Sequence, residues 1–222
     1  MEPLAPSTSD AILVGDPRRA FALAQSFTAD PRMTHIARGL WGYLGRFGAG
    51  SLVVQSTGAG GGPAATIVNE MASQGFRRMI RMGTCEAVDP DLEIGTVVTV
   101  EIALGEDGAS RTLASAGPGE PPPEVEPDGS LARALVPAGT ATRVTSRDLP
   151  ARIDPGPDPG TPVRDLQSAA FLLSARLAGL EAAALLVVAE DRSGRRLPEA
   201  GVEEAFAGLD GLLARALDRG KP

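Results

Sequence analysis

The stretch Arg77-Arg78-Met79-Ile80-Arg81-Met82-Gly83-Thr84-Cys85 has the pattern of an apolar strand that ends in an arginine, a glycine and a hydroxyl group. Such a strand would deliver Arg81 and Thr84 to the carboxyl edge of a sheet, where Gly83 lets backbone amides approach a ligand. Arginine and backbone amides together are typical of sites that hold a small oxyanion. The stretch therefore predicts an α/β fold with a phosphate site.

A second stretch, near the start of the chain, also has a strand pattern next to a glycine and an arginine. The apolar run 11–14 predicts a buried strand that breaks at Gly15 and continues as a helix from Pro17. Gly15 offers a bare amide, and Arg19 adds a forked cation. If the two turns converge, they form a pocket for a dianion, and we expect its arginines to repel one another until the anion arrives. The chain holds 20 arginines and one lysine, so each arginine taken singly fits a solvated surface position.

The composition limits the classes of function. The chain has 222 residues, 43% of them hydrophobic, which is enough for one domain with a complete core. A net charge of −7 argues against nucleic acid or an anionic membrane as a partner. One cysteine and one histidine exclude a disulfide framework and the usual Cys/His zinc cages. The sequence has no basic leader with an apolar run and no apolar segment of about 20 residues, so we expect a cytoplasmic protein with no metal site.

Strand and helix patterns alternate along the chain, which predicts an α/β class. The expected strands are 51–56, 77–85, 94–102, 140–145 and 182–189, besides 11–14. The expected helices include one that ends near Gln74 and others over 130–135, 165–177 and 198–217. We expect one domain over residues 1–222, with flexible loops near 105–129 and 150–162 because both are rich in Pro and Gly.

Five pieces of the sequence, in this order, resemble one family. They are Gly15–Ala20, Arg38–Tyr43, Ser56–Pro63, Arg81–Cys85 and Asp165–Ala170. The chain is thereby similar to the nucleoside phosphorylases of the hexameric purine nucleoside and uridine phosphorylase type, which have nucleosidase relatives. The resemblance spans Gly15 to beyond Glu190 and implies a twisted mixed β-sheet between helices, in α/β/α layers. Thr84, the 56–58 turn and the run 167–169 look closer to the uridine branch.

The resemblance implies roles for the residues of the two turns. Inorganic phosphate, a co-substrate and not a cofactor, would be held by Gly15, Arg19, Arg81 and Thr84. Arg38 would reach into the site of a neighbouring subunit, which implies a homo-oligomer, a dimer or a trimer of dimers. The expected reaction transfers the pentose of a purine or pyrimidine nucleoside to phosphate and releases the free base.

The same resemblance assigns the remaining site residues. The ribose position falls on Gln167, with Asp165 nearby, and the base contacts Leu166. The general acid of the purine branch matches Glu190, with adjacent Asp191 as the competing candidate. The uridine branch instead has an arginine that matches Arg192.

Three departures from the family pattern leave alternatives open. Gln167 stands where the family has a glutamate, so the position lacks the negative charge that supports a cationic sugar. Pro150 stands where an aromatic residue would stack on the base. The family's amino-terminal histidine is missing, and we expect the only histidine, His35, at the surface. A nucleosidase that uses water, or a degenerate member that binds a nucleotide or sugar phosphate, remains an alternative.

Overall fold

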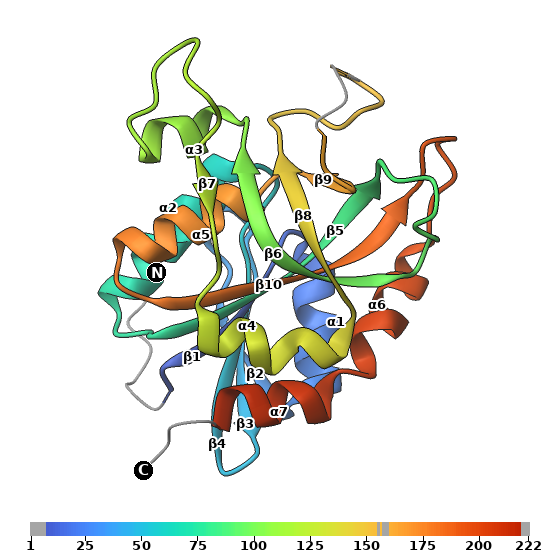
Figure 1. The fold of residues 1–222 in the computed structure, drawn as a ribbon. Helices are drawn as coiled ribbons and strands as arrows, with labels where there is room; N and C mark the ends of the chain where they lie inside the picture. The colour runs from blue at the N-terminus through green and yellow to red at the C-terminus, as the bar shows by residue number, and fades with distance from the viewer. Residues whose placement is uncertain (1–7, 155, 157–159, 219–222) are drawn as a thin grey trace.

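A mixed β-sheet between two groups of helices organises the protein (Figure 1). The computed structural model describes residues 8–154, 156 and 160–218. The strands are β1 Asp10–Val14, β2 Ala29–His35, β3 Gly42–Phe47, β4 Gly50–Ser56, β5 Arg78–Ala87, β6 Val97–Gly105, β7 Glu124–Val125, β8 Thr140–Ser146, β9 Val163–Asp165 and β10 Glu181–Glu190. The helices are α1 Pro17–Phe27, α2 Gly61–Ser73, α3 Gly108–Leu113, α4 Gly129–Leu135, α5 Ser168–Leu177, α6 Glu199–Ala207 and α7 Asp210–Asp218, with short 3-10 turns at Ala37–Gly39 and Val136–Ala138. The predicted α/β class with a mixed sheet is confirmed.

The central strands are apolar along their length because both faces of the sheet are covered. In β1, Ala11 and Leu13 belong to the core cluster that contains residues of α2 and α5. Ile12 and Val14 point the other way, into the cluster that contains residues of α1, α4, α6 and α7. Strands buried on both faces have continuous apolar runs, which explains why the sequence pattern identified them.

The order of the strands brings several carboxyl ends to one edge. β1 is parallel to both β4 and β5, and β10 is parallel to β5. Two backbone hydrogen bonds tie the turn after β1 to the turn after β4: Thr57 N donates to Val14 O at 2.8 Å, and Gly58 N donates to Gly15 O at 3.1 Å. The glycine turns after β1 and β4 therefore lie side by side.

One predicted helix boundary and one predicted loop differ from the structure, and a second predicted loop is described only in part. The helix expected over 165–177 begins only at Ser168, because the residues before it form β9, which pairs antiparallel with β5. The segment 105–129 holds α3 and β7: Asp107 caps α3 by accepting from Ser110 N at 2.9 Å, and β7 pairs with β6. Of the second predicted loop, residues 155 and 157–159 lie outside the described residues. Its described start turns at Pro150, whose carbonyl accepts from Ile153 N at 2.9 Å.

Other features of the fold differ as well. The helix expected over 198–217 is two helices, α6 and α7, with Gly208 at the end of the first. His35 is buried, so the expectation that it lies at the surface is wrong, and burial lowers the pKa of its imidazole. Among the described residues, the structure contains no helix with the length and apolarity to cross a membrane.

Candidate active site

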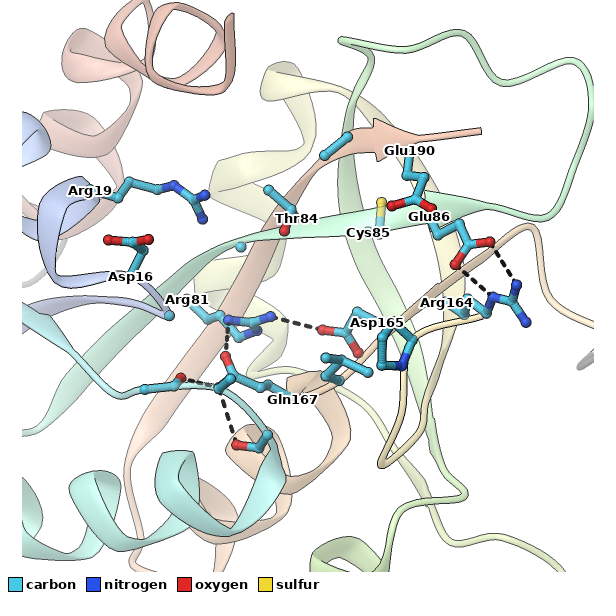
Figure 2. Close-up of a pocket in the computed structure, with 18 of the residues that line it drawn as sticks. Asp16, Arg19, Arg81, Thr84, Cys85, Glu86, Arg164, Asp165, Gln167 and Glu190 are labelled. Atoms are coloured by element: carbon cyan, nitrogen blue, oxygen red, sulfur yellow. Dashed lines mark hydrogen bonds and ion pairs between the residues drawn. The ribbon is translucent and has the colours of Figure 1, made fainter. Parts of the chain in front are cut away.

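A cavity of about 670 Å³ lies at the carboxyl edge of the parallel strands (Figure 2). Its walls come from the turns after β1 and β4, the ends of β5 and β10, the β9–α5 connection and the first residue of α6. Among the residues predicted from the sequence, those that line it are Gly15, Arg19, Arg81, Thr84, Asp165, Leu166, Gln167 and Glu190. The cavity thus gathers residues from both ends of the chain.

Arg81 is the buried centre of the cavity wall. Its guanidinium donates from Nη2 to Asp165 Oδ2 at 2.9 Å, from Nη1 to Gln167 Oε1 at 2.7 Å and from Nε to Ser168 Oγ at 3.2 Å. A guanidinium has five N–H groups, so these three bonds, counted over the described residues, leave two N–H groups that this network does not use. The three partners fix the orientation of the cation before any anion binds.

Gly83 makes room for that guanidinium. A Cβ atom at this position would lie 2.5 Å from Arg81 Nη2 and 2.6 Å from Arg81 Cζ. Any side chain here would force the arginine out of its place. The sequence predicts Gly83 as a point where backbone amides approach a ligand, and the structure adds this steric reason for the glycine.

Gln167 connects Arg81 to the glycine turn after β4. Its Oε1 accepts from Arg81, while its Nε2 donates to Gly58 O at 2.5 Å and to Gly60 O at 3.1 Å. The side chain is buried, and both amide hydrogens have backbone partners. An amide is suited to this position because a carboxylate could not donate to the two carbonyls. The side chain expected to bind ribose therefore connects the start of α5 to β5 and to the turn after β4 in this structure.

Arg19 is paired with the start of α6. Its Nε donates to Glu199 Oε1 at 2.8 Å, and its Nη2 donates to Glu199 Oε2 at 3.0 Å. Arg19 itself is buried, whereas the Glu199 side chain is 49% exposed. A carboxylate thus already faces one of the two arginines predicted to bind phosphate.

The charges of the cavity are paired rather than repulsive. Its described arginines are Arg19, Arg81, Arg152, Arg164 and Arg196, and its described carboxylates are Asp16, Glu86, Asp165, Glu190 and Glu199. Four of the arginines are in ion pairs with four of these carboxylates. The expectation that the arginines repel one another until an anion arrives is therefore wrong, because each buried cation has a carboxylate partner, as burial of charge requires.

The end of the cavity away from Arg19 is built from two further ion pairs (Figure 2). Arg164 on β9 donates to both carboxylate oxygens of Glu86 on β5, at 3.0 and 2.6 Å. At the end of β10, Arg196 Nε lies 3.1 Å from Glu190 Oε2. Glu190 is therefore at the cavity, as the resemblance implies, and Glu86 is its neighbour.

Cys85 lines the cavity next to Thr84, but its thiol is unreactive. Burial, and then the negative charge of Asp165, raise the pKa of its thiol well above the ordinary value, although Arg81 opposes them. A thiol held protonated is a weak nucleophile. Thr84 also lines the cavity, where its hydroxyl group can donate to an anion.

The structure does not bring Asp191, Arg192 or Arg38 to the cavity wall. Asp191 closes an exposed turn, where it accepts from the Ser193 hydroxyl at 2.6 Å, and this hydrogen bond lowers the pKa of its carboxyl below the usual value. Arg38 lies on the outside, ion-paired with Glu70 at 2.7 Å, and its side chain is 53% exposed. Its backbone is left-handed, with φ 60°.

Six of the described charged residues that line the cavity were not predicted as site residues from the sequence: Asp16, Glu86, Arg152, Arg164, Arg196 and Glu199. Glu86 could have been found, since it lies two positions beyond Thr84 and strand residues at this spacing share a face. Glu199 is 180 residues from its partner Arg19, and no local pattern indicates such a contact.

Comparisons with known proteins identify relatives of this chain. A family model described as the phosphorylase superfamily matches residues 10–157. The chain is 32% identical over 103 residues to the purine nucleoside phosphorylase DeoD-type of Oceanobacillus iheyensis, a match that covers 46% of this chain and 44% of the relative. It is 34% identical over 101 residues to the protein of the same name from an Exiguobacterium species, over 45% of this chain and 43% of the relative. The chain thus spans less than half of the length of the curated relatives that it matches.

Proposed function

Because this chain belongs to the phosphorylase superfamily, we propose that it is a nucleoside phosphorylase. In this reaction, an oxygen of inorganic phosphate attacks C1′ of the pentose. The bond from C1′ to the base nitrogen breaks with its electron pair on the base, and the products are a pentose 1-phosphate and the protonated free base. The observation that carries the proposal is that Gly15, Arg19, Arg81 and Thr84 all line one cavity, in which Arg19 and Arg81 lie at the end away from Glu86 and Glu190 (Figure 2).

Phosphate would bind at this end, with its charge facing two buried guanidinium groups. Arg81 is already oriented by its three protein partners and keeps two N–H groups for the anion. Hydrogen bonds between guanidinium and phosphate are charge-assisted and fix direction as well as affinity. Phosphate held in this way is positioned against the sugar. The entropy cost of bringing the two reactants together is then paid on binding and not in the chemical step.

The departing base would lie toward Glu86 and Glu190. Glu190, which is 16% exposed and lies 3.1 Å from Arg196, would first take up a proton from water that reaches the cavity, and would then pass this proton to the base as the bond breaks. The sequence motifs suggest the uridine branch, but the curated relatives are named purine nucleoside phosphorylases. We therefore favour a purine base, with a pyrimidine as the alternative.

We also propose that Arg38 serves the cavity of a neighbouring subunit in a homo-oligomer. Its position outside this chain's own cavity supports the proposal, and so does its exposed side chain. A residue held in the left-handed region without being glycine costs conformational energy, and such strain is often retained at functional positions.

A second candidate follows from Gln167. Since its amide is used by Arg81, Gly58 and Gly60, it leaves little capacity for the ribose hydroxyls. A member that binds a nucleotide or sugar phosphate without turnover is compatible with this arrangement. Loss of turnover with retained phosphate binding would identify this candidate.

The test is base release from purine and pyrimidine nucleosides, with and without inorganic phosphate, for the native protein and for Arg19→Gln. We expect phosphate-dependent release, and a KM for phosphate raised about tenfold or more in the variant, because a charge-assisted hydrogen bond is lost. Arg46→Gln is the matched control, since Arg46 forms an exposed ion pair with Asp30 away from the cavity. Release that is independent of phosphate would contradict the proposal and indicate a nucleosidase.

A further inference from the structure

Two carboxylates stand next to each other at the base end of the cavity. Glu86 on β5 and Glu190 on β10 are cross-strand partners in two parallel strands. Both line the cavity, and Figure 2 shows them together at the end away from Arg19. Their side chains are 15% and 16% exposed, so both are largely shielded from bulk water but accessible from the cavity.

Glu86 is held in place from outside the cavity. Arg164 binds it with a two-pronged contact, Nε to Oε2 at 3.0 Å and Nη2 to Oε1 at 2.6 Å. Each carboxylate oxygen has two lone pairs, so after these bonds each oxygen can still accept a hydrogen bond. The arginine thus fixes the orientation of the Glu86 carboxylate, whose oxygens can accept hydrogen bonds from a ligand.

The pair matches one edge of a purine. When Glu190 gives its proton to the ring nitrogen N7, the neighbouring group on the same edge of the base is the substituent at C6. In a 6-aminopurine this substituent is an N–H donor, and in a 6-oxopurine it is a carbonyl oxygen. Because Glu86 is the cross-strand neighbour of Glu190, a base whose N7 faces Glu190 can place its C6 substituent beside Glu86.

We propose that Glu86 is a specificity-determining residue that accepts a hydrogen bond from the exocyclic amino group of a 6-aminopurine nucleoside. The proposal rests on the proposed function, in which Glu190 protonates the base. A 6-oxopurine would place its carbonyl oxygen against the Glu86 carboxylate, with no hydrogen between the two acceptors. The two acceptors would repel each other, and the carbonyl would displace water that could donate to Glu86; this cost is what rejects the wrong base.

The experiment compares kcat/KM for adenosine and inosine, both with phosphate present. In the native protein we expect the ratio to favour adenosine by about tenfold or more. Glu86→Gln keeps the shape but adds an amide that can donate to the carbonyl of inosine, so we expect the ratio to fall by about tenfold. Glu124→Gln is the matched control, because Glu124 pairs with Arg143 outside this cavity; its ratio should equal that of the native protein.

Each outcome decides the proposal. A native protein that cleaves inosine as well as adenosine, or a Glu86→Gln ratio equal to the native ratio, overturns it. If neither nucleoside is cleaved, the proposed function fails, and titration calorimetry with free adenine and free hypoxanthine then tests the inference by itself. Tighter binding of adenine that is lost in Glu86→Gln supports the role of Glu86, whereas equal binding of the two bases overturns it.

Discussion

Gln167 illustrates at the level of a single residue how the sequence and the structure give different roles to one position. From sequence, the position matches a ribose-binding glutamate, and the glutamine looks like a loss of function. In the structure, the amide ties Arg81 to the carbonyls of Gly58 and Gly60. These contacts need one acceptor and two donors on the same side chain, which only an amide provides. The glutamine is therefore explained by the local packing of polar groups.

We predict that Gln167→Glu destabilises the protein. The carboxylate would gain an ion pair with Arg81 but would face two carbonyl oxygens without a donor, so we expect the free energy of unfolding to fall by about 2 kcal/mol. Denaturant unfolding measures this change. Gln25→Glu, at an exposed position of α1, is the control and should be nearly neutral. A variant of unchanged stability with higher turnover would show instead that Gln167 is a lost ribose ligand.

The single residues that could be predicted from the sequence are those that follow apolar strands. Gly15 and Thr84 were identified because a strand pattern ended next to them, and the structure places both at the cavity. Asp191 and Arg192 were assigned through the family resemblance as residues just beyond Glu190, and an exposed turn takes them away from the cavity wall. A resemblance in sequence does not detect the position at which the strand ends and such a turn begins.

At the level of secondary-structure elements, the first turn of α6 contributes directly to the site. Glu199 is the first residue of this helix and pairs with Arg19 from α1, so the two helices meet at the phosphate end of the cavity. Its negative charge stabilises the guanidinium when the cavity is empty. Once a phosphate arrives, the same charge repels it.

Glu199→Gln should therefore strengthen phosphate binding. An ion pair with one exposed partner contributes at most about 1 kcal/mol, so we expect the dissociation constant for phosphate to fall about two- to fivefold. Calorimetric titration with inorganic phosphate measures it. Glu204→Gln removes the same charge from an exposed position of the same helix and should leave the constant unchanged. Equal or weaker binding in Glu199→Gln would mean that the pair positions Arg19 for the anion and does not compete with it.

Elements differed in how well the sequence revealed them. The strands β1 and β10 were predicted because burial on both faces leaves a continuous apolar run, and β5 because Met79, Ile80 and Met82 give it an apolar pattern around Arg81. β2 was not, because it is an edge strand with mostly polar residues and Pro31, and only its pairing with β3 identifies it. The helix over 198–217 was predicted as one, since α6 and α7 share an amphipathic pattern across the break at Gly208.

For the whole molecule, the charge balance of the cavity is a property that no single segment reveals. Arg81 and Asp165 are 84 residues apart, and Arg19 and Glu199 are 180 residues apart. The sequence predicts the cations because they follow strands, but their partners are set by long-range topology. The result is a cavity in which most charges are neutralised in pairs, so that phosphate binding depends on the N–H groups that the pairs leave over.

The central claim is that phosphate, held by Arg19 and Arg81, is the group that attacks the sugar. The most direct measurement is ³¹P NMR of a mixture of the protein, inorganic phosphate and the nucleoside from which base is released fastest. We expect a pentose 1-phosphate resonance to appear in proportion to the base released. Release of base with free pentose and no new phosphorus resonance would contradict the account.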